Sequence, residues 1–207
     1  MRVLVACEYS GIVRDAFLAR GHNAMSCDIL PTESPGPHYQ GDVRDVLYED
    51  WDMVIAHPPC TYLSKAGARW MYPSAGVVCS DRYDKAMQAR EFFMLFLSLD
   101  TPKVAIENPT PLKVAELPLH SQAIQPYEFG EPYSKRTLLW LKGLPPLRPT
   151  DILDTYQTYL PSNTGGKKKG QKYNNRSISQ KEASRFFKGV AAAMAEQWSD
   201  AQPPPQP

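Results

Sequence analysis

The chain alternates between short apolar runs and segments whose apolar residues recur at helical spacing, a pattern typical of an α/β sheet. Residues 3–6 form an apolar, β-rich run, and in residues 12–18 the apolar positions recur every three or four residues. A Ser-Gly turn separates the two segments, so strand, tight turn and helix follow one another. Residues 24–27 are the next expected strand, which ends at Asp28. The N-terminal part therefore predicts a βαβ unit.

Two later apolar runs end in residues that could do chemistry. Residues 53–56 run into the sequence HPPC, which ends at Cys60, and residues 104–106 run into ENP, which begins at Glu107. Proline cannot extend the hydrogen-bonded ladder, so the chain is expected to leave the sheet at both places. Open α/β sheets bind ligands beyond the carboxyl ends of their strands. We therefore expect the thiol and the carboxylate to face one cleft.

The rest of the pattern completes an α/β fold with a mostly parallel sheet and helices on both faces. A helix at 81–99 has one apolar face, which suits covering a sheet. The final expected helix, 179–198, has apolar positions that include Phe186 and Phe187. Two further strands are expected at 121–125 and 138–141.

Length and composition are those of an ordinary globular protein. The 207 residues are 43% hydrophobic and 22% charged, with a net charge of +1. One domain is expected over residues 1–200, followed by a disordered Pro-rich tail at 201–207. No apolar run approaches the ~20 residues that a membrane span needs, and the N-terminus turns polar too soon for a secretory signal. We therefore expect a cytoplasmic protein. Its four cysteines have no CxxC spacing and no paired histidine motif, which argues against both a zinc site and a disulfide framework, so reduced thiols are expected.

Cys60 has two interpretations. A cysteine in a loop is by default a small apolar residue, whereas a nucleophile needs its thiolate form and a bound substrate. A Pro-Cys turn, then a Glu-Asn dipeptide, then Phe-Gly-x-Pro at 129–132 follow one another over about the first 140 residues. In these short motifs the chain resembles the cytosine carbon-5 methyltransferases. The resemblance implies a Rossmann-like S-adenosylmethionine-dependent methyltransferase fold, with Cys60 as nucleophile and Glu107 as the acid that holds the cytosine.

The expected cofactor is S-adenosylmethionine, bound at the ends of the first strands. A glycine turn at a helix N-terminus can approach a nucleotide-like ligand closely, and an acid such as Asp28, about 20 residues further on, suits ribose hydroxyls. The resemblance places Asp42 against the adenine amino group, although an Asp there can also be the N-cap of a short helix. The expected cofactor-binding residues are Glu8, Ser10, Gly11, Asp28, Ile29, Asp42, Val43 and Pro59.

The basic residues indicate which kind of molecule the protein would bind. The family motif that follows Phe-Gly-x-Pro contains spaced arginines, and the chain has Lys135-Arg136-Thr137 there. Arg136 is the expected base-contacting cation, in a register fixed only to within one residue. The basic, loop-rich segment 145–178 stands where the family carries a large recognition domain. Its Lys-rich run is typical of a solvated loop but also suits phosphate contact.

The expected partner is DNA or a cytosine nucleotide, with no membrane involved. The first hypothesis is methyl transfer to carbon 5 of cytosine in DNA through a covalent cysteine adduct. The second is the same chemistry on a free cytosine or pyrimidine nucleotide. The third is a non-catalytic nucleic-acid-binding protein that keeps the methyltransferase fold.

Overall fold

The computed structural model describes residues 1–158 and 185–199 of the chain. The strands are β1 (Arg2–Ala6), β2 (Asn23–Asp28), β3 (His38–Gln40), β4 (Met53–Ala56), β5 (Lys103–Pro109), β6 (Gln122–Ile124), β7 (Tyr133–Ser134), β8 (Thr137–Lys142) and β9 (Gln157–Thr158). The α-helices are α1 (Ile12–Leu18), α2 (Ala68–Met71), α3 (Ser80–Leu97) and α5 (Lys188–Ser199). Short 3-10 helices are η1 (Val43–Asp45), η2 (Lys65–Gly67), η3 (Lys113–Ala115) and η4 (Pro126–Glu128). The expected tail at 201–207 and the Lys-rich run at 167–172 lie outside the described residues.

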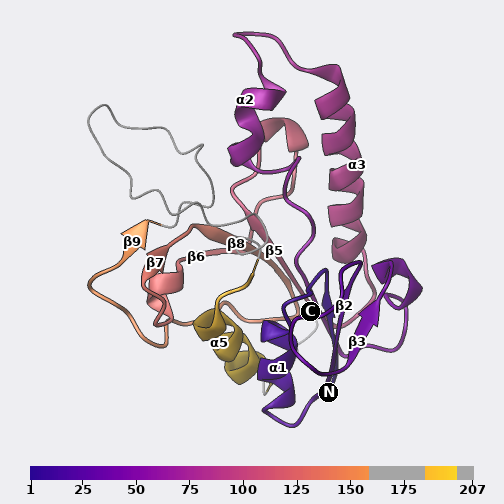
Figure 1. The fold of residues 1–207 in the computed structure, drawn as a ribbon, viewed down its shortest axis with the longest axis vertical. Helices are drawn as coiled ribbons and strands as arrows, with labels where there is room; N and C mark the ends of the chain where they lie inside the picture. Colours follow the sequence, from indigo (N-terminus) through magenta and orange to yellow (C-terminus); the bar gives the residue numbers. More distant parts are fainter. Residues whose placement is uncertain (159–184, 200–207) are drawn as a thin grey trace, which may run out of the picture.

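Seven strands form one mostly parallel sheet in the order β3-β2-β1-β4-β5-β8-β6 (Figure 1). The pairs β2–β3, β1–β2, β1–β4 and β4–β5 are parallel, whereas β8 is antiparallel to both β5 and β6. A sheet with one reversed strand near its edge is the Rossmann-like arrangement of S-adenosylmethionine-dependent methyltransferases. The predicted fold class is therefore confirmed.

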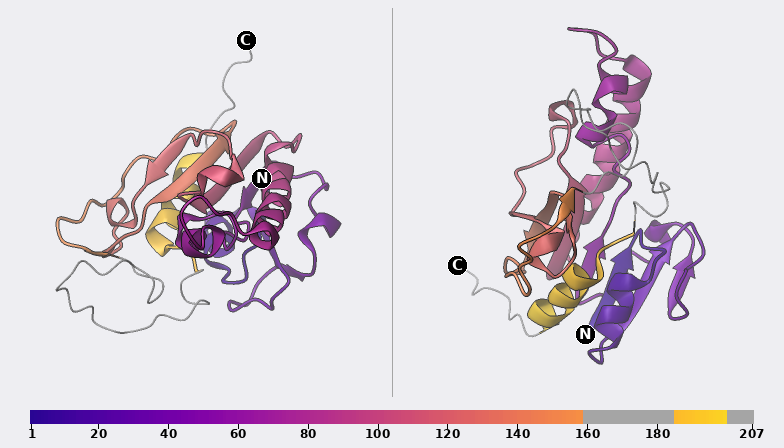
Figure 2. Two further views of the ribbon diagram at one scale, coloured as in Figure 1. Left: turned by 90° about the horizontal axis from the view of Figure 1, so that it is seen from above. Right: turned by 60° about the vertical axis from the view of Figure 1, so that its left-hand side comes forward.

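Helices cover both faces of this sheet (Figures 1 and 2). On one face α1 and α5 lie side by side, and Phe17 and Trp198 are fully buried there. On the other face α3 buries Phe93 and Phe96 against Val54 and its neighbours in the sheet. Full burial of each such side chain contributes roughly 1.5–3 kcal/mol, so the two clusters account for a large part of the folding free energy.

The structure corrects several expected boundaries. The strand expected at 104–106 continues through Glu107 to Pro109, because its residues pair with β8. The final helix begins at Lys188, so the expectation that Phe186 and Phe187 are helical is wrong. In the first turn of this helix a Cβ atom at Gly189 would come within 1.8 Å of the Phe129 carbonyl oxygen, so the helix N-terminus packs closely against Phe129.

Within the described ranges no helix is both long and apolar enough to cross a bilayer.

Candidate active site

The loops that follow β4 and β5 are hydrogen-bonded to each other. The Leu112 N–H donates to the Leu63 carbonyl oxygen at 2.7 Å, and the Lys65 N–H donates to the Thr110 carbonyl oxygen at 2.9 Å. The first of these loops starts with a tight turn whose acceptor is the Cys60 carbonyl oxygen. The segment that carries the thiol is therefore fixed against the segment that follows Glu107.

Glu107 has a histidine beside it. Ala56 on β4 pairs with Ile106 on β5, so the next residues along, His57 and Glu107, are also neighbours across the sheet. The His57 Nδ1 lies 3.6 Å from Glu107 Oε2, and the two side chains are only 11% and 16% exposed. This pair stands at the carboxyl edge of the sheet, where ligands bind in open α/β folds.

The pKa values of the Cys60 thiol and the Glu107 carboxylate are shifted in opposite directions. Burial, followed by the negative charge of Glu107, raises the pKa of the Cys60 thiol, and Lys135 partly offsets this. Burial acts to raise the pKa of Glu107, but the His57 side chain, whose Nδ1 is 3.6 Å away, and the charge of Lys135 prevail and lower it. The structure thus brings Cys60, Glu107 and Lys135 within electrostatic range of one another. At neutral pH the thiol is therefore protonated and the carboxylate is ionised.

The cation of this site is Lys135. Its side chain is partly buried, with the Nζ 5.5 Å from the ring centroid of Phe187, whereas the neighbouring Arg136 is exposed. Within the basic motif it is therefore Lys135, one position before the residue expected from sequence, whose charge acts on both Cys60 and Glu107.

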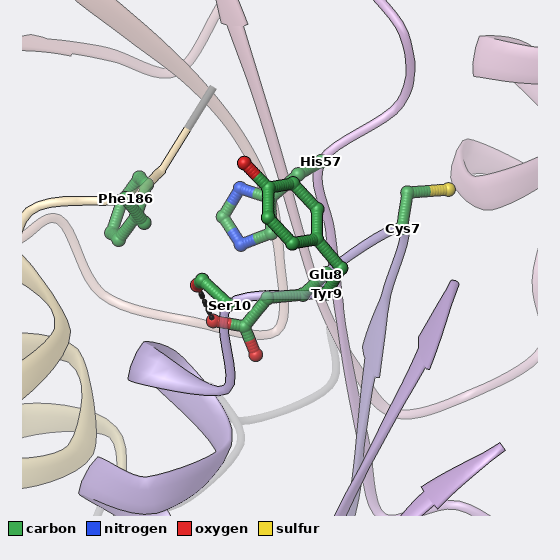
Figure 3. Close-up of a pocket in the computed structure, with 6 residues that line it drawn as sticks. All are labelled: Cys7, Glu8, Tyr9, Ser10, His57 and Phe186. Carbon is green, nitrogen blue, oxygen red and sulfur yellow. Dashed lines mark hydrogen bonds between the residues drawn. The ribbon is translucent and has the colours of Figure 1, made fainter. Parts of the chain in front are cut away.

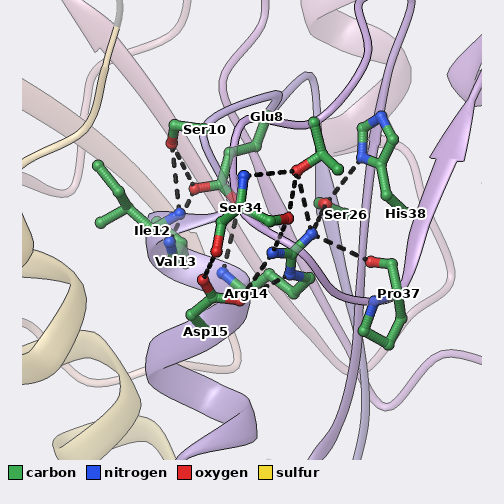
Figure 4. A network of polar contacts seen from close by, with 11 residues as sticks. Glu8, Ser10, Ile12, Val13, Arg14, Asp15, Ser26, Ser34, Pro37 and His38 are labelled. Atoms are coloured by element: carbon green, nitrogen blue, oxygen red, sulfur yellow. Dashed lines mark hydrogen bonds and ion pairs between the residues drawn. The ribbon is translucent and has the colours of Figure 1, made fainter.

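The turn between β1 and α1 is organised by Glu8 (Figure 4). Its carboxylate accepts hydrogen bonds from the Val13 N–H at 2.7 Å, from the Arg14 N–H at 3.2 Å and from the Ser10 hydroxyl at 3.1 Å. An acid suits this place because the first N–H groups of a helix have no partner within it. Both oxygens of Glu8 are thus used by the fold, and the side chain stabilises α1.

Gly11 and Arg14 hold the next loop in place. Gly11 has the left-handed φ of 75°, and a Cβ atom there would come within 2.4 Å of an Arg14 guanidinium nitrogen. The fully buried guanidinium donates to the Ser26 hydroxyl at 3.1 Å and to the Ser34 carbonyl oxygen at 2.9 Å, and pairs with Asp15 at 2.8 Å. Gly11 is therefore needed for the packing of Arg14, whose hydrogen bonds are drawn in Figure 4.

Two acids gather where β1 and β2 end. Asp28 and Asp42 both act to raise the pKa of Cys7, so all three lie close together. Asp28 accepts a hydrogen bond from the Leu30 N–H at 2.9 Å through one oxygen, and Ile29 beside it is 75% exposed. This end of the sheet thus offers a carboxylate next to an open apolar surface.

Asp42 has the role of a helix cap. Its side chain accepts the Arg44 N–H at 2.9 Å and pairs with the Arg44 guanidinium, also at 2.9 Å. The backbone hydrogen bond is the main cause of the lowered pKa of Asp42. Val43 is only 5% exposed, whereas Pro59 is exposed next to Cys60. The N-cap alternative therefore holds, with the Asp42 carboxylate still facing solvent.

A small pocket lies where the chain leaves β1 and β4 (Figure 3). It is lined by Cys7, Glu8, Tyr9, Ser10, His57 and Phe186. The ring of Phe186 packs on His57 with 4.7 Å between centroids. The Cys7 side chain is turned away from His57 and Tyr9 (Figure 3), in keeping with its positive φ of 58°.

Sequence reasoning missed three residues of this site. His57 could have been found, because it follows β4 as Glu107 follows the matching position in β5. Lys135 was within the one-residue ambiguity of the basic motif. Phe186 carries no sequence signal for this place, because only the path of the chain before α5 brings it to His57.

No protein-family model and no curated protein matches the chain. Several solved structures do resemble it. A protein described as a DNA modification methyltransferase encoded within an E. coli prophage is 14% identical with a TM-score of 0.43, over 68% of this chain and 46% of that one. A mutant of Spodoptera frugiperda DNMT2 is 14% identical with a TM-score of 0.38, over 79% and 56%. The Entamoeba histolytica methyltransferase EhMeth is 12% identical with a TM-score of 0.43, over 74% and 57%. The chain thus spans about half the length of these proteins.

Proposed function

We propose that the protein transfers a methyl group from S-adenosylmethionine to carbon 5 of cytosine in DNA, through a covalent adduct with Cys60. The observation that supports this most is the hydrogen-bonded contact between the Cys60 loop and the segment after Glu107. It keeps a thiol and an ionised carboxylate near one another at the carboxyl edge of the sheet, with the cation Lys135 in range of both.

The acids at the other end of this edge fit the nucleoside part of the cofactor. Asp28 keeps one oxygen without a hydrogen bond among the described residues, which can accept from a ribose hydroxyl. The exposed Ile29 offers an apolar surface to a planar base, and the Asp42 carboxylate can accept from an amino group. Since the side chain of Glu8 is already bound to α1, the turn at Ser10 and Gly11 would contact the cofactor through its backbone. S-adenosylmethionine supplies an electrophilic methyl group when bound.

Cys60 would act first. Carbon 5 of cytosine is a weak nucleophile, and addition of the thiolate to carbon 6 forms a sulfur–carbon bond that places electron density on carbon 5. Carbon 5 would then take the methyl group, with S-adenosylhomocysteine as the leaving group, and loss of the carbon 5 proton to solvent would let the carbon–sulfur bond break and return the thiolate. Because the Cys60 thiol is protonated at rest, its proton must leave before the addition.

Glu107 and Lys135 would hold the cytosine ring. The ionised carboxylate accepts a hydrogen bond from the exocyclic amine, and it can bind ring nitrogen 3 only when one of the two carries a proton. The ammonium of Lys135 suits the ring carbonyl oxygen, where negative charge grows as the thiolate adds. We assign this role to Lys135 in preference to the exposed Arg136.

The test is transfer of a tritiated methyl group to duplex DNA, single-stranded DNA and deoxycytidine monophosphate, each offered separately. A base within a duplex must first leave the stack, at a cost of a few kcal/mol. We expect transfer to DNA, none to the nucleotide, and binding that weakens steeply with salt as counterions compete for the phosphates. Cys60→Ser should abolish transfer and still bind S-adenosylmethionine. Transfer to the nucleotide alone would favour the monomer substrate, and an active Cys60→Ser protein would exclude the nucleophile.

A further inference from the structure

The two ring nitrogens of His57 differ in their surroundings. The Nδ1 faces Glu107 at 3.6 Å, whereas the Nε2 is buried and lacks a hydrogen-bond partner among residues 1–158 and 185–199. Buried polar atoms in folded proteins are nearly all paired. The unpaired Nε2 therefore indicates that a ligand or a water molecule binds next to it.

The partner on Nδ1 determines what Nε2 can do. The Glu107 carboxylate is ionised and only accepts hydrogen bonds, so the proton of a neutral imidazole lies on Nδ1. The Nε2 of that tautomer carries a lone pair. The missing partner is therefore a hydrogen-bond donor.

The walls of the pocket favour a donor that carries positive charge. His57 stands between Tyr9 and Phe186, with the nitrogen-bearing edge of its ring turned toward Phe186 (Figure 3). Faces of aromatic rings attract cations, and the carboxylate of Glu8 adds a negative charge to the same wall. A primary ammonium group combines this charge with the donors that Nε2 requires.

We propose that the pocket is a subsite for a primary ammonium group, which donates a hydrogen bond to the Nε2 of His57 and lies against the rings of Tyr9 and Phe186. This rests on the proposed function, within which the group is the α-ammonium of S-adenosylmethionine. One imidazole then joins the amino-acid end of the cofactor to Glu107, the acid that holds the base. The Phe186 ring has to move aside as the group enters, because the pocket is small.

Two variants of His57 test the roles of the two ring nitrogens independently. In His57→Asn the side-chain amide reaches only the place of Nδ1, so the contact with Glu107 can persist while the acceptor is lost. In His57→Gln the amide reaches the place of Nε2, so an acceptor is kept. Circular dichroism and urea unfolding establish that both variants are folded.

The ligands are S-adenosylhomocysteine and its deaminated analogue, in which hydrogen replaces the amino group, titrated by calorimetry at pH 8. We expect the wild type to prefer the amine by about tenfold or more, the value of one charged hydrogen bond. His57→Asn should lose this preference while binding the deaminated analogue as the wild type does, and His57→Gln should keep most of it.

Equal affinity of the wild type for the two ligands, or equal loss of both in His57→Asn, would overturn the subsite, with a water as the natural occupant of the pocket. Failure of the wild type to bind either ligand would overturn the proposed function as well. The two failures are therefore distinguishable.

Discussion

Replacing Arg14 with methionine tests the network that shapes the edge of the sheet. The guanidinium is fully buried and connects α1 to β2 and to the loop after it, through Ser26, Thr32 and the carbonyl oxygens of Ser34 and Pro37. Methionine keeps the aliphatic stem and removes every donor. The loop begins at residue 29, so this side chain helps to attach the surface proposed for adenosine to the fold.

The expected loss can be worked out from these contacts. Removing the guanidinium leaves at least two partly or fully buried acceptors, the Ser26 hydroxyl and the Ser34 carbonyl oxygen, without their donor, and each unsatisfied group costs about 1–3 kcal/mol. With a urea m-value of about 2 kcal/mol/M, a loss of ~4 kcal/mol lowers the unfolding midpoint by about 2 M. Native proteins are stable by only about 5–15 kcal/mol, so Arg14→Met should remove a large share of the total. Affinity for S-adenosylhomocysteine should fall in parallel.

Arg20→Met, just beyond the C-terminal end of α1, is the matched control. Arg20 pairs with Glu196 at 3.4 Å, but the two side chains are 44% and 58% exposed. Exposed ion pairs contribute about 0–1 kcal/mol, so this variant should unfold within about 0.5 M of the wild type. A midpoint for Arg14→Met within the same 0.5 M would refute the view that its guanidinium holds the loop.

Two further predictions concern the charges at the candidate active site. Alkylation of Cys60 by iodoacetamide, followed by mass spectrometry of its peptide, should show a midpoint above the usual thiol pKa of 9.0, because burial and Glu107 disfavour the thiolate. Glu107→Gln should speed alkylation at pH 8 and Lys135→Gln should slow it, and equal rates in the three proteins would contradict the assigned electrostatics. The lowered pKa of Glu107 also predicts a pH-dependent stability. The folded pKa lies below the usual 4.5, so the contribution is complete above about pH 4.5 and is lost as pH falls through the folded pKa. In urea titrations the stability advantage of the wild type over Glu107→Gln should therefore shrink between pH 6 and pH 3, and a constant difference would show that the ionised form is not favoured by folding.

Much of the fold was predictable because the responsible interactions are local. The helix at 12–18 and the strand at 53–56 have the observed boundaries, since each is marked by its own apolar period and by a glycine or proline at its end. The contact between the Cys60 loop and the segment after Glu107 was predictable for a related reason. Parallel strands place their carboxyl ends at one edge, so two strand ends with suitable residues converge.

The roles of individual side chains were harder to predict, because they depend on tertiary contacts. An acid after the first strand suggested a cofactor ligand, but the carboxylate of Glu8 is bound to the N–H groups of α1. Arg14 gave no signal, since its partners are brought together only by the folded loop. Likewise the choice between Lys135 and Arg136 depended on which side of the chain faces Cys60.

The most direct test of the proposed chemistry is covalent trapping on DNA that contains 5-fluorocytosine, in the presence of S-adenosylmethionine. Fluorine replaces the proton that must leave carbon 5, so the bond between sulfur and carbon 6 cannot break once the methyl group has been transferred. Mass spectrometry should find the methylated nucleotide attached to the peptide that contains Cys60, and nothing attached to the Cys60→Ser protein. An adduct on another residue, or methylated DNA formed without any adduct, would contradict the proposal that the thiol beside Glu107 is the nucleophile.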